Sequence, residues 1–267
     1  MSDYISLSAW DIALASVFLL LNAALSLWLR LKLERQLLVA ATRMIVQLLM
    51  VGLVLKAVFA VQSVWVTLLV AVVMVGFAGR EIVARQERRL AGLWGVTLGG
   101  GAMMAAGTFV AVFALTTQIQ PNPWWAPQFA LPLFGMILGN TMTGVSLGLD
   151  TLHSTLVREK LAIEAQLLLG RPAFTAMRPV VRRALRSGFT PIINAMAATG
   201  VVSLPGMMTG QILSGVDPQE AVKYQLLIMF LIGGATGLGV LGAVMASVRR
   251  LTDRRQRLRL DRLAKTG

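Results

Sequence analysis

The sequence predicts an all-α integral membrane protein with seven transmembrane helices and one polar segment between the fifth and the sixth. Its 267 residues are 56% hydrophobic and only 14% charged, and the mean hydropathy is +0.72, which argues against a water-soluble globule. Apolar runs recur along the chain, each long enough to cross about 30 Å of hydrocarbon as a helix. Helices are expected because backbone groups in lipid must pair within their own segment.

The seven expected spans follow one another along a single transmembrane domain, residues 1–267. They cover residues 8–29, 37–59, 62–79, 91–117, 128–149, 190–214 and 221–247. These runs are too long and continuous for the tilted strands of a membrane barrel. The polar segment at residues 150–189 is the exception, and we expect it in the cytosol.

The basic residues are distributed unevenly between the two sides of the membrane. Nearly all of the 25 lysines and arginines lie in every second connection and in the C-terminal tail, whereas the opposite side has only Lys56 and Lys223. Because basic residues accumulate on the cytoplasmic side, we expect the amino terminus outside and the tail in the cytosol. The net charge of +13 then reflects orientation and contact with anionic membrane lipid, and no nucleic-acid partner is expected.

Polar side chains interrupt two of the expected spans. In the second span, Arg43 and Gln47 are four residues apart and share one helical face. Arg43 either extends to the cytosolic headgroups or contacts a substrate. In the fifth span, Asn140, Thr141 and Thr143 lie near mid-depth, where they either bond to neighbouring helices or line a pathway.

The sixth expected span, residues 190–214, is the most interrupted. Pro205 lies between Gly200 and Gly206, and Asn194, Ser203 and Gln211 add polar side chains to the same span. A proline-interrupted helix frees backbone carbonyls, which can coordinate a cation only where they face protein or a water-filled cavity. The sequence therefore predicts a transport-related break at this span.

The cytosolic segment is expected to contain two helices. In the first, which is expected to begin at Val157, apolar residues recur from Val157 at Leu161, Ala165 and Leu168 and form one apolar stripe. Gly170 is a natural helix stop, after which Pro172 can begin the next helix.

The second helix of this segment is expected to be basic. It carries a stripe of arginines suited to the inner leaflet, and it should end at Ser187–Gly188, before Pro191 begins the sixth span. The arginines of this stripe are Arg178, Arg182, Arg183 and Arg186.

Residue types needed for common enzymatic chemistry are scarce. The chain has no cysteine and a single histidine, which excludes the usual zinc sites. We interpret that histidine, His153, as a residue at the membrane interface, with a two-residue cation contact as the alternative. Gly and Lys never adjoin, so there is no Walker A phosphate loop, and the G-x-S-x-G pattern around Ser146 lies in an apolar helix. We expect no catalytic residues. Met207 and Met208 are either soft-metal ligands or ordinary fillers of an apolar helix.

Several stretches together resemble one known family. They are "RMIVQLLMVGLVLKAVF" in the second span, "GMILGNTMTGVSLGL" in the fifth, "LLLGRP", and above all "GVVSLPGMMTGQILSGVDPQEAVKYQ". The chain resembles the Fet-type iron-export ABC permeases of bacteria, whose plant relatives are linked to aluminium tolerance. The resemblance covers most of residues 34–247 and includes the specific "SLPGMM" run.

The resemblance implies a membrane subunit of the bacterial inner membrane that forms a homodimer and joins a separately encoded ABC ATPase. That partner would bind ATP and Mg²⁺, so no cofactor is expected on this chain, and the complex would export a metal ion, iron first. A short cytosolic helix before a glycine turn also resembles the coupling helix of ABC permeases, although Gln166 departs from the E-A-A-x-x-x-G pattern. The residues expected to couple to the ATPase are Glu164, Ala165, Leu168, Gly170 and Arg171.

The candidates for a translocation path combine the polar positions with the broken span. They are Arg43, Gln47, Asn140, Asn194, Ser203, Pro205, Met207, Met208, Gln211 and Gln225. The sequence assigns no metal ligands among them. The alternative is an ion-driven secondary transporter or channel without an ATPase, which usually needs paired carboxylates inside its spans. The acidic residues here lie at span ends, as Asp11, Glu81, Asp150 and Glu220 do. A membrane scaffold without transport predicts neither the polar positions nor the broken span.

Overall fold

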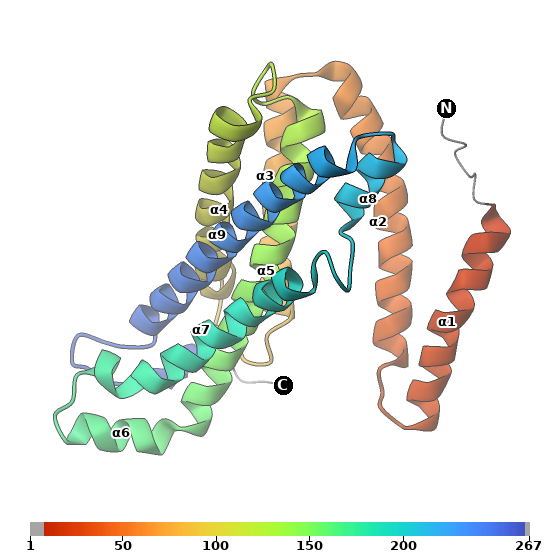
Figure 1. Cartoon of the computed structure of the whole chain (residues 1–267). Coiled ribbons are helices and arrows are strands. Elements are labelled where there is room, and N and C mark those ends of the chain that lie inside the picture. Colours follow the sequence, from red (N-terminus) through yellow and green to blue (C-terminus); the bar gives the residue numbers. More distant parts are fainter. Residues whose placement is uncertain (1–7, 265–267) are drawn as a thin grey trace. The chain divides into compact units, whose positions relative to one another are not determined.

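The computed structural model describes residues 8–264, whose regular elements are helices (Figure 1). In chain order these are α1 (Ala9–Trp28), α2 (Glu34–Val61), α3 (Val64–Ala84), α4 (Trp94–Phe113), η1 (Ala114–Ile119), α5 (Pro127–Arg158), α6 (Lys160–Leu168), α7 (Ala173–Ala198), α8 (Gly206–Leu213), α9 (Pro218–Arg250) and η2 (Leu260–Arg262). Six of the segments are long and apolar enough to cross a membrane: α1, α2, α3, α4 with η1, α5 and α9.

The first of two compact units ends at Val61 and is a hairpin of α1 and α2. Ser8 and Asp11 form a capping box at the start of α1. At the turn, the Ser26 hydroxyl donates to Glu34 at 2.9 Å and accepts from the Leu33 N–H at 3.0 Å. The remaining side chains of both helices are mostly apolar and exposed, as expected for helices in a bilayer.

The second unit, residues 62–267, is built around α5, the long green helix in Figure 1. This helix contacts α3, α4, α7 and α9. It meets α7 at two glycines: a Cβ added to Gly144 would lie 2.8 Å from the Gly188 carbonyl oxygen, and a Cβ added to Gly188 would lie 2.9 Å from that of Gly144. Val240 of α9 closes the crossing, with a methyl group 2.5 Å from the same added Cβ on Gly188. Small residues of this kind allow helix backbones to approach closely.

Two threonine–glycine contacts join α5 to α9 beside this crossing. The Thr141 methyl group would lie 2.5 Å from a Cβ added to Gly239, and the Thr236 methyl group 2.8 Å from one added to Gly144. Both threonines are buried, and neither hydroxyl has a hydrogen-bond partner among the described residues. The close packing of α5 and α9 therefore encloses two unpaired polar groups.

The expected span at residues 190–214 is not among these six segments, because the break predicted in it divides it into two helices. α7 ends at Ala198, residues 199–205 are irregular, and α8 begins at Gly206. Gly200 has a φ of +90°, a conformation that ends a right-handed helix and that glycine adopts at little cost. The other six expected spans are present as long apolar helices whose ends differ by several residues from the prediction.

The expected helix boundary at Ser187–Gly188 is wrong. α7 is a single helix from Ala173 to Ala198 with Pro191 in its interior. Gly188 stays helical because its backbone packs directly on α5, and an interior proline can bend a helix without ending it. At the other end of the polar segment, α5 continues past residue 149 to Arg158.

Replacing Gly188 with alanine should destabilise the second unit, because the new Cβ would lie 2.5 Å from Val240 and 2.9 Å from the Gly144 backbone. Overpacking of this kind costs about 1–3 kcal/mol, which thermal unfolding in detergent would measure. The matched control is Gly139→Ala on α5, where nothing lies within 4 Å of the added Cβ. That control should leave the melting temperature unchanged or raise it. An equal loss in both variants would contradict the close crossing.

Candidate functional site

α6 directs most of its apolar side chains away from the core. Ile163 is buried and holds the helix against the rest of the unit, whereas Leu161 and Leu168 are 80% and 88% exposed. With Ala165, these two residues form a stripe on the face opposite Ile163, here called the leucine stripe. Val157, the first residue of the predicted stripe, belongs instead to α5 and packs against the core. Exposed leucines at one end of a helical unit are typical of a surface that binds another molecule.

The connection between α6 and α7 is a tight elbow. Gly170 has a φ of +81°, so the predicted helix stop is confirmed, and a residue with a side chain would be strained there. Arg183 of α7 forms an ion pair with Glu159, directly before α6. α6 is thus held against α7 at its start and joined to it by the elbow at its end.

The other predicted coupling residues make local contacts. Glu164 pairs with Lys160 on the same helix at 3.7 Å, and the Arg171 guanidinium donates to Gln166 at 3.4 Å. Both contacts lie at the surface, where ion pairs contribute little to stability. These side chains therefore remain accessible to a partner protein.

The break between α7 and α8 exposes both backbone and side chains. The Gly200 N–H donates to the Ser203 carbonyl at 2.9 Å, which closes a small turn, and Val201 and Val202 are 92% and 83% exposed. Within the described chain, the carbonyl groups of residues 199–202 accept no hydrogen bond. Irregular backbone of this kind is tolerated at membrane depth only where it faces protein or water.

Arg43 and Gln47 lie together on α2, as their spacing predicts. They line a shallow hollow on one face of that helix. Asn140 of α5 is exposed and donates to its own helix at Met136, 2.8 Å away. Within residues 8–264 it has no hydrogen bond to a neighbouring helix. Thr143 likewise bonds to its own helix.

Asn194 and Ser203 lie on either side of the end of α7, and both are exposed. The Ser203 hydroxyl lies 3.5 Å from the Ala198 carbonyl oxygen, and Pro205 is the N-cap residue of α8. No hydrogen bond among the described residues joins Asn194 to this turn. The turn itself therefore offers backbone carbonyls and one hydroxyl.

Gln211 and Gln225 belong to α8 and α9, two helices in contact. The amide oxygen of each is buried and has no hydrogen-bond partner among the residues described, although an unpaired buried acceptor is costly. Also in α8, Met207 packs against the core and Met208 is half-buried. Within residues 8–264, no group of three or more His, Cys, Asp or Glu side chains could hold a metal ion.

His153 is buried, and the expectation that it lies at the interface is wrong. Its Nδ1 is 2.9 Å from the Arg88 carbonyl oxygen and its Nε2 is 2.7 Å from the Ser247 hydroxyl. Because a carbonyl oxygen only accepts, Nδ1 donates and Nε2 accepts from Ser247. One turn earlier, Asp150 accepts from the Glu87 N–H at 2.8 Å. His153 therefore joins α5 to α9 and to the α3–α4 connection, and Asp150 adds a second bond to that connection. The sequence did not indicate these contacts.

The tail after α9 is folded, a feature that the sequence analysis missed. The Ala91 N–H donates to the Arg262 carbonyl and the Ala264 N–H to the Arg89 carbonyl, both at 2.8 Å. Leu263 is buried in the same pairing. The tail is therefore attached to the α3–α4 connection as a short antiparallel pair.

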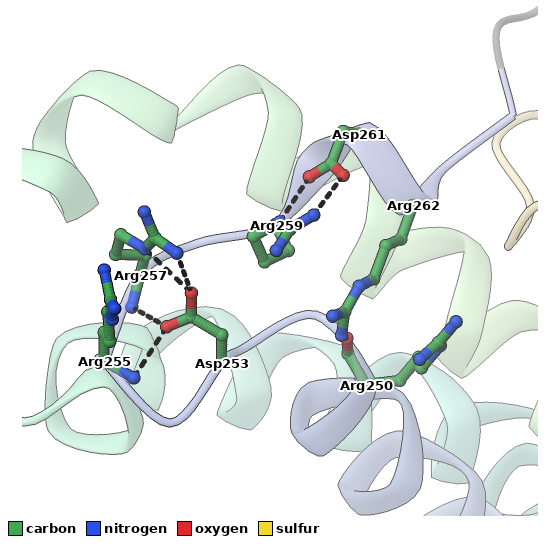
Figure 2. Close-up of polar contacts among 7 residues, drawn as sticks. All are labelled: Arg250, Asp253, Arg255, Arg257, Arg259, Asp261 and Arg262. Atoms are coloured by element: carbon green, nitrogen blue, oxygen red, sulfur yellow. Dashed lines mark hydrogen bonds and ion pairs between the residues drawn. The ribbon is translucent and has the colours of Figure 1, made fainter.

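The first part of the tail forms a compact loop, here called the arginine turn (residues 252–258). Asp253 accepts from the backbone N–H groups of Arg255 and Arg257, both at 2.9 Å, and from the Arg257 side chain at 2.8 Å (Figure 2). The Arg257 backbone is the main cause of the lowered pKa of Asp253. Farther along, the Arg259 guanidinium lowers the pKa of Asp261 to about 2. An aspartate before polar residues is a common turn signal that could have indicated this loop.

Comparison with known proteins agrees with this membrane architecture. The sequence model described as an uncharacterised protein family, UPF0014, matches residues 9–252. The chain belongs to the UPF0014 family. No solved structure matches it.

Three UPF0014 relatives illustrate the range of the family. A membrane protein of Synechocystis is 39% identical over 90% of this chain and 92% of its own length. A protein of Escherichia coli named as a probable iron export permease is 30% identical over 96% of each chain. The Arabidopsis thaliana protein ALUMINUM SENSITIVE 3 is 30% identical over 84% of this chain and 80% of its own length. The resemblance found in the sequence motifs is thereby confirmed.

Replacing His153 with phenylalanine in this UPF0014 protein should loosen the α3–α4 connection. The change leaves the Arg88 carbonyl and the Ser247 hydroxyl without their partner, at a cost of about 1–3 kcal/mol if they stay unpaired. Limited trypsin digestion should then cleave faster after Arg88 and Arg89. The control is Ser154→Ala, because the buried Ser154 hydroxyl has no partner to lose. Unchanged cleavage in the His153 variant would show that the two bonds do not hold the connection.

Proposed function

We propose that this chain is the membrane-spanning permease subunit of an ABC transporter that exports a metal ion, with iron as the first candidate. A separate ATPase subunit would bind and hydrolyse ATP with Mg²⁺, and two copies of this chain would form the membrane part in the bacterial inner membrane. The relationship to the Escherichia coli protein named as a probable iron export permease supports the substrate. This chain would act as a transporter subunit and not as an enzyme.

The observation that carries the proposal is the leucine stripe on α6. Two leucines that are at least 80% exposed lie on a short helix held to α7 by the Glu159–Arg183 ion pair and a glycine elbow. A helix presented in this way suits insertion into a groove of a partner, where apolar anchors supply most of the binding free energy. The basic connections on the same side favour a cytosolic location.

We infer a seventh crossing made of two short pieces. α5 and α9 end on the same side of the second unit, because His153 of α5 contacts Ser247 near the end of α9. The chain between them must therefore return to the opposite side before α9 begins at Pro218. α7, the break and α8 would make that return, so that the two termini would lie on opposite sides of the membrane. The basic tail favours the arrangement with the amino terminus outside and the tail in the cytosol.

In this arrangement α7 links the ATPase to the transport path. Movement of α6 by the ATPase would act through the elbow on α7 and hence on the break at residues 199–205. The break offers unpaired carbonyl oxygens, and Gln211 and Gln225 offer unpaired amide oxygens. Neutral oxygens of this kind can coordinate a cation weakly enough to release it.

The competing function is an ion-driven transporter or channel without an ATPase. Such proteins usually carry ionisable side chains within the bundle. The buried polar side chains of the described chain are amides, hydroxyls and His153, with no carboxylate among them. This supports an external source of energy.

Changing Leu161 and Leu168 together to glutamate should weaken co-purification with the ABC ATPase proposed as the partner of this chain. The loss should be at least about tenfold, because two apolar anchors become charged. Since both side chains are exposed, the thermal stability of the permease should not change. Ala162→Glu is the control, because Ala162 is also exposed on α6 but lies about 100° from the stripe. An equal loss with the control would argue against docking through the stripe.

Replacing Gly200 with alanine should reduce export of iron from cells. The residue has a φ of +90°, and a left-handed conformation costs a residue with a side chain about 1–2 kcal/mol. Gly206→Ala serves as the control, since Gly206 is at the first position of α8 and has free space around it. Cellular iron after a pulse of excess metal measures the effect. Normal export by the Gly200 variant would exclude a role for this turn.

A further inference from the structure

We propose that the arginine turn is a second docking contact for the ATPase and that it binds an acidic surface of that protein. The inference rests on the proposed function, because it takes the ATPase as the partner. It adds an electrostatic contact to the apolar contact of the leucine stripe.

The arginine turn is an ordered loop that internal hydrogen bonds hold together. The Asp253 carboxylate organises it through three hydrogen bonds to Arg255 and Arg257, as Figure 2 shows. Leu258 packs against the core, and the Thr252–Leu258 bridge closes the loop. Pre-organisation of this kind lowers the entropy cost of binding.

Two positive charges of the turn lack an acidic partner. Arg257 is paired with Asp253 and Arg259 with Asp261. Arg254 and Arg255 are exposed and form no ion pair within residues 8–264. Two unpaired guanidinium groups carried on a hydrogen-bonded turn suit a carboxylate surface, because each can form a bidentate hydrogen bond.

The turn lies directly beside the α6–α7 elbow. The Gln256 side-chain oxygen accepts from the Ala173 N–H at 2.8 Å, and Ala173 is the first residue of α7, three positions after Gly170. The uncompensated arginines and the leucine stripe therefore lie at the same end of the second unit. One partner could contact both.

Anionic lipid is the other possible ligand of these arginines. Attraction to lipid headgroups depends mainly on the number of positive charges, and removing Asp253 would strengthen it. Docking to a protein depends on the positions of the charges, and removing Asp253 would weaken it. The two ligands thus predict opposite effects of a single substitution.

The experiment is Asp253→Ala in the full-length chain, with binding to the ABC ATPase that co-purifies with the wild-type chain measured at low salt. The affinity should fall about tenfold although the permease becomes more positive. Asp261→Ala is the matched control, because it removes the same charge from the same tail without touching the turn; its affinity should be unchanged. Equal or tighter binding by the Asp253 variant would overturn the proposal.

The second test is the charge-reversal variant in which Arg254 and Arg255 are both replaced with glutamate. ATPase binding should fall about tenfold or more at low salt, and the difference should shrink at high salt. Unchanged ATPase binding, together with loss of co-purified anionic phospholipid in native mass spectrometry, would overturn docking to the ATPase in favour of lipid. If the wild-type chain does not bind the ATPase at all, the proposed function fails as well. If the leucine-stripe variant loses binding and both turn variants keep it, only the arginine turn is excluded.

Discussion

The second unit depends on the contact between the backbones of α5 and α7 at Gly144 and Gly188. In a bilayer, helices gain little from burying apolar surface, so their association depends on close van der Waals packing. Here an added Cβ on either glycine would lie under 3 Å from the carbonyl oxygen of the other. Val240, Thr141 and Thr236 pack around the same crossing. The path of α7 across the unit follows from this contact.

The crossing divides α7 into two arms with different surroundings. From Ala173 to Gly188 the helix spans about 22 Å and carries the elbow to α6, while from Gly188 to Ala198 it spans about 15 Å and leads to the break. Because α7 is one continuous helix on both sides of this contact, a tilt of one arm would also move the other. The irregular residues 199–205 would absorb that tilt, because they are not restrained by a hydrogen-bonded ladder. The sequence predicted a helix end at Gly188, but it is the continuity of α7 through Gly188 that connects α6 to the break at residues 199–205.

The sequence was informative where one local pattern decides the structure. Apolar length predicted six of the membrane helices, and the spacing of Leu161, Ala165 and Leu168 with Gly170 predicted α6 and its end. It failed where a distant contact overrides a local signal: Gly188 and Pro191 suggest a helix end, but packing on Gly144 keeps α7 helical. The fold of the tail depends on Gln256 and Leu263 meeting residues far along the chain, and His153 depends on Arg88 and Ser247 in the same way. Such pairings have no signature within a single segment.

The polar groups near the break also bear on how a cation could cross. Hydration holds a divalent cation strongly, and a carboxylate cage would replace that hydration at the risk of trapping the ion. The described part of the chain buries no carboxylate, and its unpaired acceptors are amide oxygens, hydroxyls and backbone carbonyls. These neutral groups would replace the water ligands of the cation only in part. Entry of the cation would therefore need a conformational change of the permease, driven by a source of energy other than cation binding. A coupling helix at one end of α7 and a break at the other would supply that change without any ion gradient.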